Sequence, residues 1–171
     1  DSKDMDHATW QALALRCTHW LAQPDVGGIV ITHGTDTLEE TAWFLQLVLH
    51  TTKPVVLTCA MRPATALTPD GPQNLLDAMA VVCDPMARGV LTVCAGRIHS
   101  ARDVQKVHPY RLDAFSSGES GPRGWVEQGR VRWSDPCPWP MVHVHARQAL
   151  SVPCAEWPWV AVLLSHAGSD A

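Results

Sequence analysis

The segment GIVITHGTDTLEE, residues 28–40, decides the fold class of this chain. Residues 28–32 form an apolar run that ends in threonine, which predicts a strand buried on both faces, as in a parallel sheet. Residues 37–40 have the pattern of a capping box that begins a helix. The polar residues between them follow the carboxyl end of the strand, where α/β proteins bind ligands. We therefore expect functional side chains at this edge of a sheet.

Helix and strand patterns alternate on both sides of this segment. The spacing of apolar residues predicts helices over 6–23, 37–50 and 72–84 and strands over 28–32, 54–58 and 89–94. This βαβαβ order predicts a parallel sheet flanked by helices, with right-handed crossovers, and the leading helix implies a further strand before residue 1. Residues 95–122 have a polar, irregular pattern, whereas 124–133 predict a hairpin that turns at 127–130.

Composition excludes several classes of protein. The 171 residues are 46% hydrophobic and 18% charged, which suits one globular core and part of a second. A formal net charge of -4 without a basic stripe argues against binding to nucleic acid. No apolar run approaches the roughly 20 residues that span a bilayer, so we expect no membrane partner.

The six cysteines are scattered and form no C-x-x-C pair. We interpret them as reduced core residues, which favours a cytoplasmic location, with the periplasm as the alternative. His143 and His145 share one face of an extended segment, but no further ligand is spaced to complete a zinc site. We therefore expect no bound metal.

Prolines mark the expected domain boundary. Five of them lie between Ser134 and Pro158, so residues 1–134 are interpreted as one α/β domain and 135–158 as a linker. Residues 159–171 are expected to begin a second, smaller α/β domain, with its first strand over 160–165.

Three side chains offer the parts that amide hydrolysis requires. Thr35 has a hydroxyl at a strand end, Asp36 an adjacent carboxylate, and Lys106 an amine whose pKa falls if it is desolvated, so that it could accept a proton from Thr35. Lys106 lies 71 positions after Thr35 (106 − 35), and spacing alone does not show that they meet.

Simpler interpretations stand beside this one. Thr35 and Asp36 also suit a turn that leads into a helix, and Lys106 alone also suits a solvated surface lysine. His33 is interpreted as a structural histidine and Cys59 as a packing residue.

Five segments resemble the bacterial L-asparaginase/glutaminase family, in the family's order along the chain. They are residues 1–5 (DSKDM), 29–42 (IVITHGTDTLEETA), 54–63 (including PVV and AMRP), 70–75 (DGPQNL) and 102–106 (RDVQK). The resemblance implies a flavodoxin-like N-terminal α/β domain, a smaller C-terminal α/β domain and a homotetramer, with no metal or organic cofactor.

The resemblance also implies roles for individual residues. By position, Thr35 resembles the family's second catalytic threonine, Lys106 its partner lysine, and Asp36 the carboxylate that binds the substrate's ammonium group and supports proton transfer. Ser2 resembles the residue that holds the substrate's α-carboxylate. Lys3 stands where the family often has glutamine and could contact the same carboxylate.

Two further features of the family concern the rest of the site. By the resemblance, Ala60 stands at a position where the family's backbone approaches the ligand, and Cys59 beside it stands where many relatives have glycine. The family's primary nucleophile is a threonine in a T-G-G-T-I segment that these 171 residues do not contain, and we expect it to precede Asp1.

The sequence therefore predicts an L-asparagine amidohydrolase that uses a threonine nucleophile, with some activity on glutamine. The 171 residues alone are expected to be inactive. Two alternatives stay open: a non-catalytic amino-acid-binding or degenerate family member, and a subunit of a glutamyl-tRNA amidotransferase.

Overall fold

A computed structural model describes residues 2–134, 146 and 148–162. The helices are α1 (His7–Leu21), α2 (Leu38–Val48) and α3 (Gly71–Val82), and 3-10 turns lie at η1 (Ser2–Asp4), η2 (Gly118–Ser120), η3 (Gln148–Ser151) and η4 (Cys154–Glu156). The strands are β1 (Ile29–Thr32), β2 (Val55–Thr58), β3 (Val90–Cys94), β4 (Arg97–Ser100), β5 (Gln105–Lys106), β6 (Phe115–Ser116), β7 (Gly124–Glu127) and β8 (Arg130–Trp133). The fold is α/β, as the sequence predicted.

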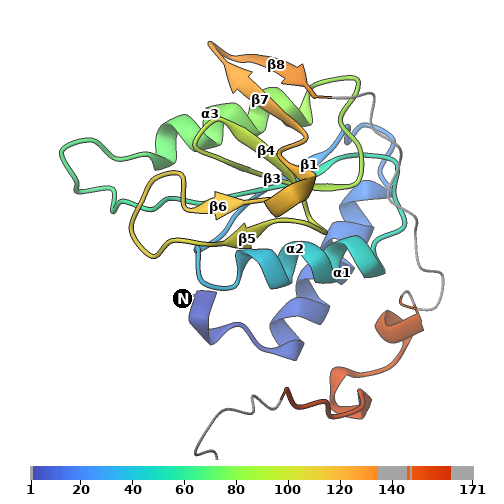
Figure 1. Ribbon diagram of the computed structural model, residues 1–171. Helices are drawn as coiled ribbons and strands as arrows, with labels where there is room; N and C mark the ends of the chain where they lie inside the picture. Colours follow the sequence, from blue (N-terminus) through green and yellow to red (C-terminus); the bar gives the residue numbers. More distant parts are fainter. Residues whose placement is uncertain (1, 135–145, 147, 163–171) are drawn as a thin grey trace, which may run out of the picture.

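The main sheet has six strands in the order β1-β2-β3-β4-β7-β8 (Figure 1). β1, β2 and β3 pair in parallel, whereas β4, β7 and β8 add an antiparallel half. β5 and β6 form a separate two-stranded sheet. The expected parallel unit is confirmed, but the expectation of an irregular segment over 95–122 was wrong, because β4, β5 and β6 lie within it.

β4 is formed because the chain reverses within two residues after β3. Ala95 and Gly96 have φ angles of 49° and 71°, the left-handed pair of a tight hairpin turn. The expected hairpin over 124–133 forms β7 and β8, and Gln128 and Gly129 have the same kind of backbone, with φ angles of 52° and 74°.

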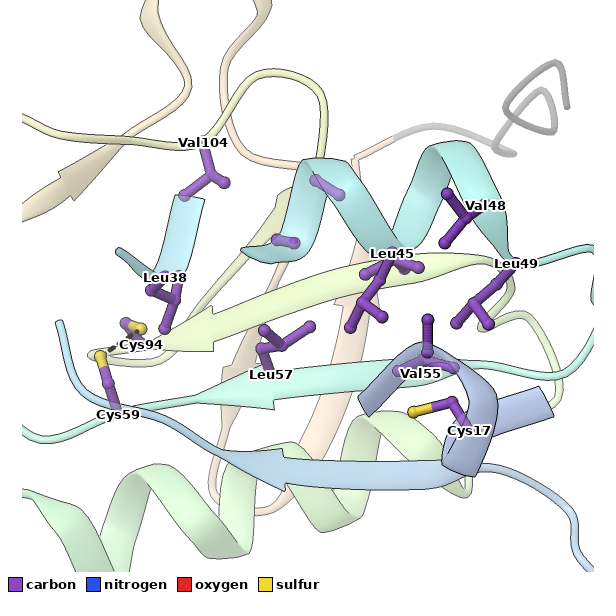
Figure 2. Close-up of a cluster of buried hydrophobic side chains, with 14 of the residues drawn as sticks. Cys17, Leu38, Leu45, Val48, Leu49, Val55, Leu57, Cys59, Cys94 and Val104 are labelled. Atoms are coloured by element: carbon purple, nitrogen blue, oxygen red, sulfur yellow. Dashed lines mark hydrogen bonds between the residues drawn. The ribbon is translucent and has the colours of Figure 1, made fainter. Parts of the chain in front are cut away.

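Two layers of side chains cover the parallel strands. Val55 and Leu57 of β2 pack with residues of α1 and α2, whereas Val56 packs with residues of α3. Figure 2 shows Val55 and Leu57 in the first of these layers, together with Leu45 of α2. α2 and α3 therefore lie on opposite faces of the sheet, as Figure 1 also shows.

This arrangement overturns the expectation of right-handed crossovers. β1, β2 and β3 follow one another in the same direction across the sheet, so two right-handed connections would place α2 and α3 on the same face. Because α2 and α3 cover opposite faces, one of the two connections is left-handed. This hand is rare for parallel strands, which is why the sequence pattern favoured the other.

Two local expectations also need correction. β1 is half-buried up to its exposed last residue, and not buried on both faces, because it is an edge strand of the described sheet. The capping box was wrong: Thr37 makes no side-chain cap to α2, because its hydroxyl donates to the carbonyl of Ser2 at 2.6 Å. The N-cap of α1 is as expected, since Asp6 accepts from the backbone N–H of Thr9 at 2.7 Å.

Residues 152–157 pack against α1 and α2. Gln11 of α1 donates to the carbonyl of Val152 at 2.6 Å and accepts from the N–H of Cys154 at 3.1 Å. The ring of Trp157 lies 5.9 Å from that of Phe44 in α2. Half of the expected linker, 135–158, and half of the expected strand, 160–165, lie outside the described residues, and residues 160–162 are not in a strand.

Candidate active site

The carboxyl edge of the parallel sheet gathers the polar residues that the sequence singled out. Thr35 and Asp36 lie in the loop between β1 and α2, and Lys106 is the last residue of β5. The amine of Lys106 donates to the Thr35 hydroxyl at 2.7 Å and to Asp36 Oδ1 at 2.8 Å. Folding thus joins side chains that are 71 positions apart in the sequence.

Lys106 and Asp36 form an ion pair at the mouth of the site. The side chain of Lys106 is 20% exposed and that of Asp36 is 58% exposed, so the carboxylate faces solvent while the amine lies behind it. The hydrogen bond and charge of Lys106 hold the pKa of Asp36 below its usual value, with smaller effects from Thr35 and Lys3. Asp36 is therefore an ionised group that an incoming cation can reach.

Lys106 is held by its backbone as well as by its side chain. A carboxylate oxygen of Glu39, in the first turn of α2, accepts the backbone N–H of Lys106. Sequence reasoning assigned no role to Glu39, because the pattern Thr-x-x-Glu directed attention to capping by Thr37 and Glu40. The two adjacent acids at the start of a helix that follows a functional loop were the signal that could have identified it.

Ser2 lies directly against the loop that carries Thr35. Its hydroxyl accepts the N–H of Asp36 at 3.2 Å. A Cβ built on Gly34 would lie 2.7 Å from the Cβ of Ser2, so only glycine fits at position 34. Lys3 is exposed on the same 3-10 turn and lies close enough to lower the pKa of Asp36. Ser2 and Lys3 are thus neighbours of the Thr35–Asp36–Lys106 cluster.

Ala60 is exposed and is the second residue of the loop after β2. Residues of α3 and its N-cap bond to the backbone on both sides of it. Asp70 accepts the N–H groups of Met61 at 2.9 Å and Arg62 at 2.8 Å. Asn74 donates to the carbonyl of Cys59 at 2.9 Å. The conformation of this loop is therefore set by two polar residues at the start of α3, for which the sequence motif at 70–75 suggested no role.

His33 has the structural role expected of it. Its Nδ1 lies 2.7 Å from the carbonyl of Gly34, so this nitrogen donates. Its Nε2 lies 3.1 Å from the hydroxyl of Thr41, which in turn accepts from the indole of Trp10 at 2.8 Å. Both ring nitrogens are bonded, and the ring braces the loop that leads to Thr35.

The described part of the chain contains neither a metal-ligand cluster nor a helix that could span a membrane. Within it, no group of three or more His, Cys, Asp or Glu side chains is arranged to hold a metal ion. His143 and His145 lie outside the described residues. None of the described helices is both long and apolar enough to cross a bilayer.

These features define an α/β protein with a hydroxyl, an amine and a carboxylate gathered at the carboxyl edge of a parallel sheet. The family model described as "Asparaginase, N-terminal" matches residues 1–138. The chain belongs to the asparaginase family, whose members are amide hydrolases.

Proteins of similar sequence support this assignment. The chain is 49% identical over 122 residues to L-asparaginase 2 of Bacillus subtilis, covering 70% of this chain and 32% of that protein. It is 52% identical over 111 residues to a glutaminase-asparaginase of Pseudomonas aeruginosa, covering 64% and 30%. The chain thus spans about a third of the length of the curated relatives it matches.

A solved structure agrees in fold. The crystal structure of a probable cytoplasmic L-asparaginase from Campylobacter jejuni superposes with a TM-score of 0.78 and 44% sequence identity. The match covers 81% of this chain and 44% of that one.

Proposed function

We propose that the protein containing this chain is an L-asparagine amidohydrolase, which converts L-asparagine and water to L-aspartate and ammonia through a threonine acyl-enzyme. The observation that carries the proposal is the contact of the Lys106 amine with both the Thr35 hydroxyl, at 2.7 Å, and Asp36, at 2.8 Å. Glutamine is proposed as a second substrate, because several relatives are named glutaminase-asparaginase.

In this proposal, Lys106 moves the proton of Thr35. An uncharged Lys106 amine accepts the hydroxyl proton as the oxygen attacks or activates water, and returns it to the departing ammonia. The ion pair with Asp36 holds the charged amine while the site is empty. The substrate's ammonium group, bound by the exposed Asp36, would compete with Lys106 for that carboxylate and weaken the ion pair.

Ser2, Lys3 and Ala60 complete the proposed substrate site. Ser2 lies against the Thr35 loop, and its hydroxyl can turn to donate to the α-carboxylate of a bound amino acid. Lys3 adds a positive charge for the same carboxylate. The backbone at Ala60, held by the contacts that α3 makes with its neighbours, would lie along the substrate's amide side.

Other parts of the proposed enzyme are expected beyond these residues. We expect a first nucleophilic threonine in a Gly-rich segment of the longer protein, so the 171 residues alone should release little or no ammonia. We also propose a homotetramer and a cytoplasmic location, with the periplasm as the alternative. The competing function is a non-catalytic member that binds the amino acid without hydrolysing it.

The test is Thr35→Val in the full-length protein, which removes the hydroxyl but keeps the shape of the side chain. Ammonia release from asparagine should fall by about 10²–10⁴-fold, the usual contribution of a positioned proton-transfer group. The matched control is Thr52→Val, at an exposed threonine outside the site, which should leave turnover unchanged.

Two outcomes would contradict the proposal. Normal turnover by the Thr35→Val protein would remove Thr35 from the mechanism. Tight binding of asparagine by the wild-type full-length protein, with no ammonia released, would favour the non-catalytic alternative.

A further inference from the structure

Two thiols are in contact at the carboxyl ends of β2 and β3. Cys59 follows β2 directly, and Cys94 is the last residue of β3. Their sulfur atoms lie 3.1 Å apart, and Figure 2 shows the contact as a dashed line beside Leu38 of α2. Both residues are buried, with 6% and 3% of their surface exposed. A disulfide bond of ~2.05 Å would require the sulfurs to approach by only about 1 Å.

The backbone already has the spacing that a disulfide needs. Thr58 and Val93 are registered partners in the parallel pair, so Cys59 and Cys94 come one residue later on each strand and project from the same face. Neighbouring strands are about 4.8 Å apart. That separation lies within the ~4.4–6.8 Å range of Cα distances spanned by disulfides.

Asn74 of α3 clamps the two strand ends together. Its side-chain N–H donates to the carbonyl of Cys59 at 2.9 Å, and its oxygen accepts the N–H of Ala95, next to Cys94, at 3.0 Å. Asn74 is itself buried. Asn74 therefore holds the ends of β2 and β3 side by side, with the two thiols in contact. A disulfide bond can form without a large movement of the backbone.

The two thiols are not equivalent. The Cys94 thiol has a pKa well above its usual range, because it is hydrogen-bonded to Cys59 and buried. Cys94 therefore stays protonated, and Cys59, which adjoins the exposed Ala60, is the sulfur that an oxidant reaches first.

We propose that Cys59 and Cys94 are a modification site that forms a reversible disulfide with a peroxide as oxidant. The sulfur of Cys59 attacks one peroxide oxygen, the O–O bond breaks, and the thiol proton leaves with the other oxygen as water. The sulfur of Cys94 then attacks the sulfenic acid of Cys59, and its proton leaves with the hydroxyl as a second water. Two thiols and one hydrogen peroxide thus give one disulfide and two waters, and the peroxide takes the two electrons.

The disulfide would act on the neighbouring site. Cys59 precedes Ala60, whose backbone is part of the proposed substrate site. Drawing the two sulfurs together would therefore shift this loop by up to about 1 Å. Because catalytic geometry tolerates little displacement, ammonia release should fall reversibly on oxidation. This effect on turnover rests on the proposed function, whereas the disulfide itself does not.

The test treats the full-length protein with hydrogen peroxide, blocks free thiols by alkylation and maps the peptides by mass spectrometry. Trypsin cuts neither before Pro54 nor before Pro63, so Cys59 and Cys94 fall on peptides 17–88 and 89–97. We expect these peptides to be joined after oxidation and separate after reduction with dithiothreitol. Cys17 and Cys83 also lie on peptide 17–88, so fragment ions must assign the bond. Because Cys83 is exposed, its oxidation reports that peroxide reached the protein.

Variants make the assignment specific. In Cys94→Ala the linked peptide should be absent, and dimedone should trap the sulfenic acid of Cys59. Cys17→Ala is the matched control, since Cys17 is buried in the same core and its variant should still form the link. Free thiols at both Cys59 and Cys94 while Cys83 is oxidised, or a Cys59 bond to any other cysteine, would overturn the proposal. A link that leaves ammonia release unchanged would overturn only its coupling to turnover.

Discussion

Acidification should destabilise this fold through one buried histidine, His99 of β4. The residue is 1% exposed, and its Nδ1 lies 2.8 Å from the hydroxyl of Ser117. Its Nε2 has no hydrogen-bond partner among the described residues. Burial, together with the nearby charge of Arg97, lowers the pKa of His99 to about 4, because a buried imidazolium would lack solvation.

The sign and size of the effect follow from the two pKa values. Well above pH 6.5 the ring is neutral in both the folded and the unfolded state, and the full stability is present. Below it the unfolded chain takes up a proton while the folded chain does not, so stability is lost as the pH falls toward the folded pKa. The expected loss is about 2 kcal/mol between pH 7 and pH 5, and about 3 kcal/mol by pH 4.

Urea unfolding followed by tryptophan fluorescence at pH 7 and pH 5 measures this loss. Most carboxylates are still ionised at pH 5, so they contribute little to the change over this interval. His99→Asn keeps a hydrogen-bonding atom near Ser117 but cannot be protonated, so its free energy of unfolding should change much less with pH. His50→Asn, at an exposed histidine, should keep the wild-type pH dependence. An equal loss in the wild type and in His99→Asn would refute the reasoning.

Two further predictions concern stability. Leu57→Ala removes a fully buried side chain from the centre of β2 and should lower the free energy of unfolding by about 2–5 kcal/mol in urea titrations, whereas Leu67→Ala, at a fully exposed position, should change it by less than about 0.5 kcal/mol. Asp6→Ala removes the acceptor for the Thr9 N–H at the start of α1 and should cost about 1 kcal/mol, measured in the same way. An Asp6→Ala protein as stable as the wild type would show that this cap contributes nothing.

The sequence predicted the parallel half of the sheet because its strands are apolar runs bounded by breakers. β4 has a different pattern: of its four residues, Arg97 to Ser100, only Ile98 is aliphatic, and its position depends on pairing with β3. The turn before it, Ala95-Gly96, lacks the asparagine or aspartate that signals a tight hairpin. Such a strand is specified by tertiary contacts more than by local pattern.

The sequence singled out the residues of the candidate site, but it did not predict their geometry. No periodicity relates Thr35 to Lys106, and in the sequence only the family resemblance links them; their 2.7 Å contact depends on the tertiary fold. The capping box was misleading for a physical reason: the Thr37 hydroxyl bonds to Ser2, which is 35 positions away in the sequence. The local motif provides a possible partner for the Thr37 hydroxyl, but the hydroxyl bonds to the carbonyl of Ser2 instead.

The change of hand between the two crossovers has a consequence for where a ligand can sit. In doubly wound sheets, a crevice opens where the strand order reverses, because adjacent loops then run to opposite faces. Here the strand order β1-β2-β3 does not reverse. The loops after β1 and β2 nevertheless lead to opposite faces of the sheet, the first to α2 and the second to α3. A single left-handed connection therefore has the same effect as a topological switch point. Thr35 lies in one of the two diverging loops, and Ala60 lies in the other.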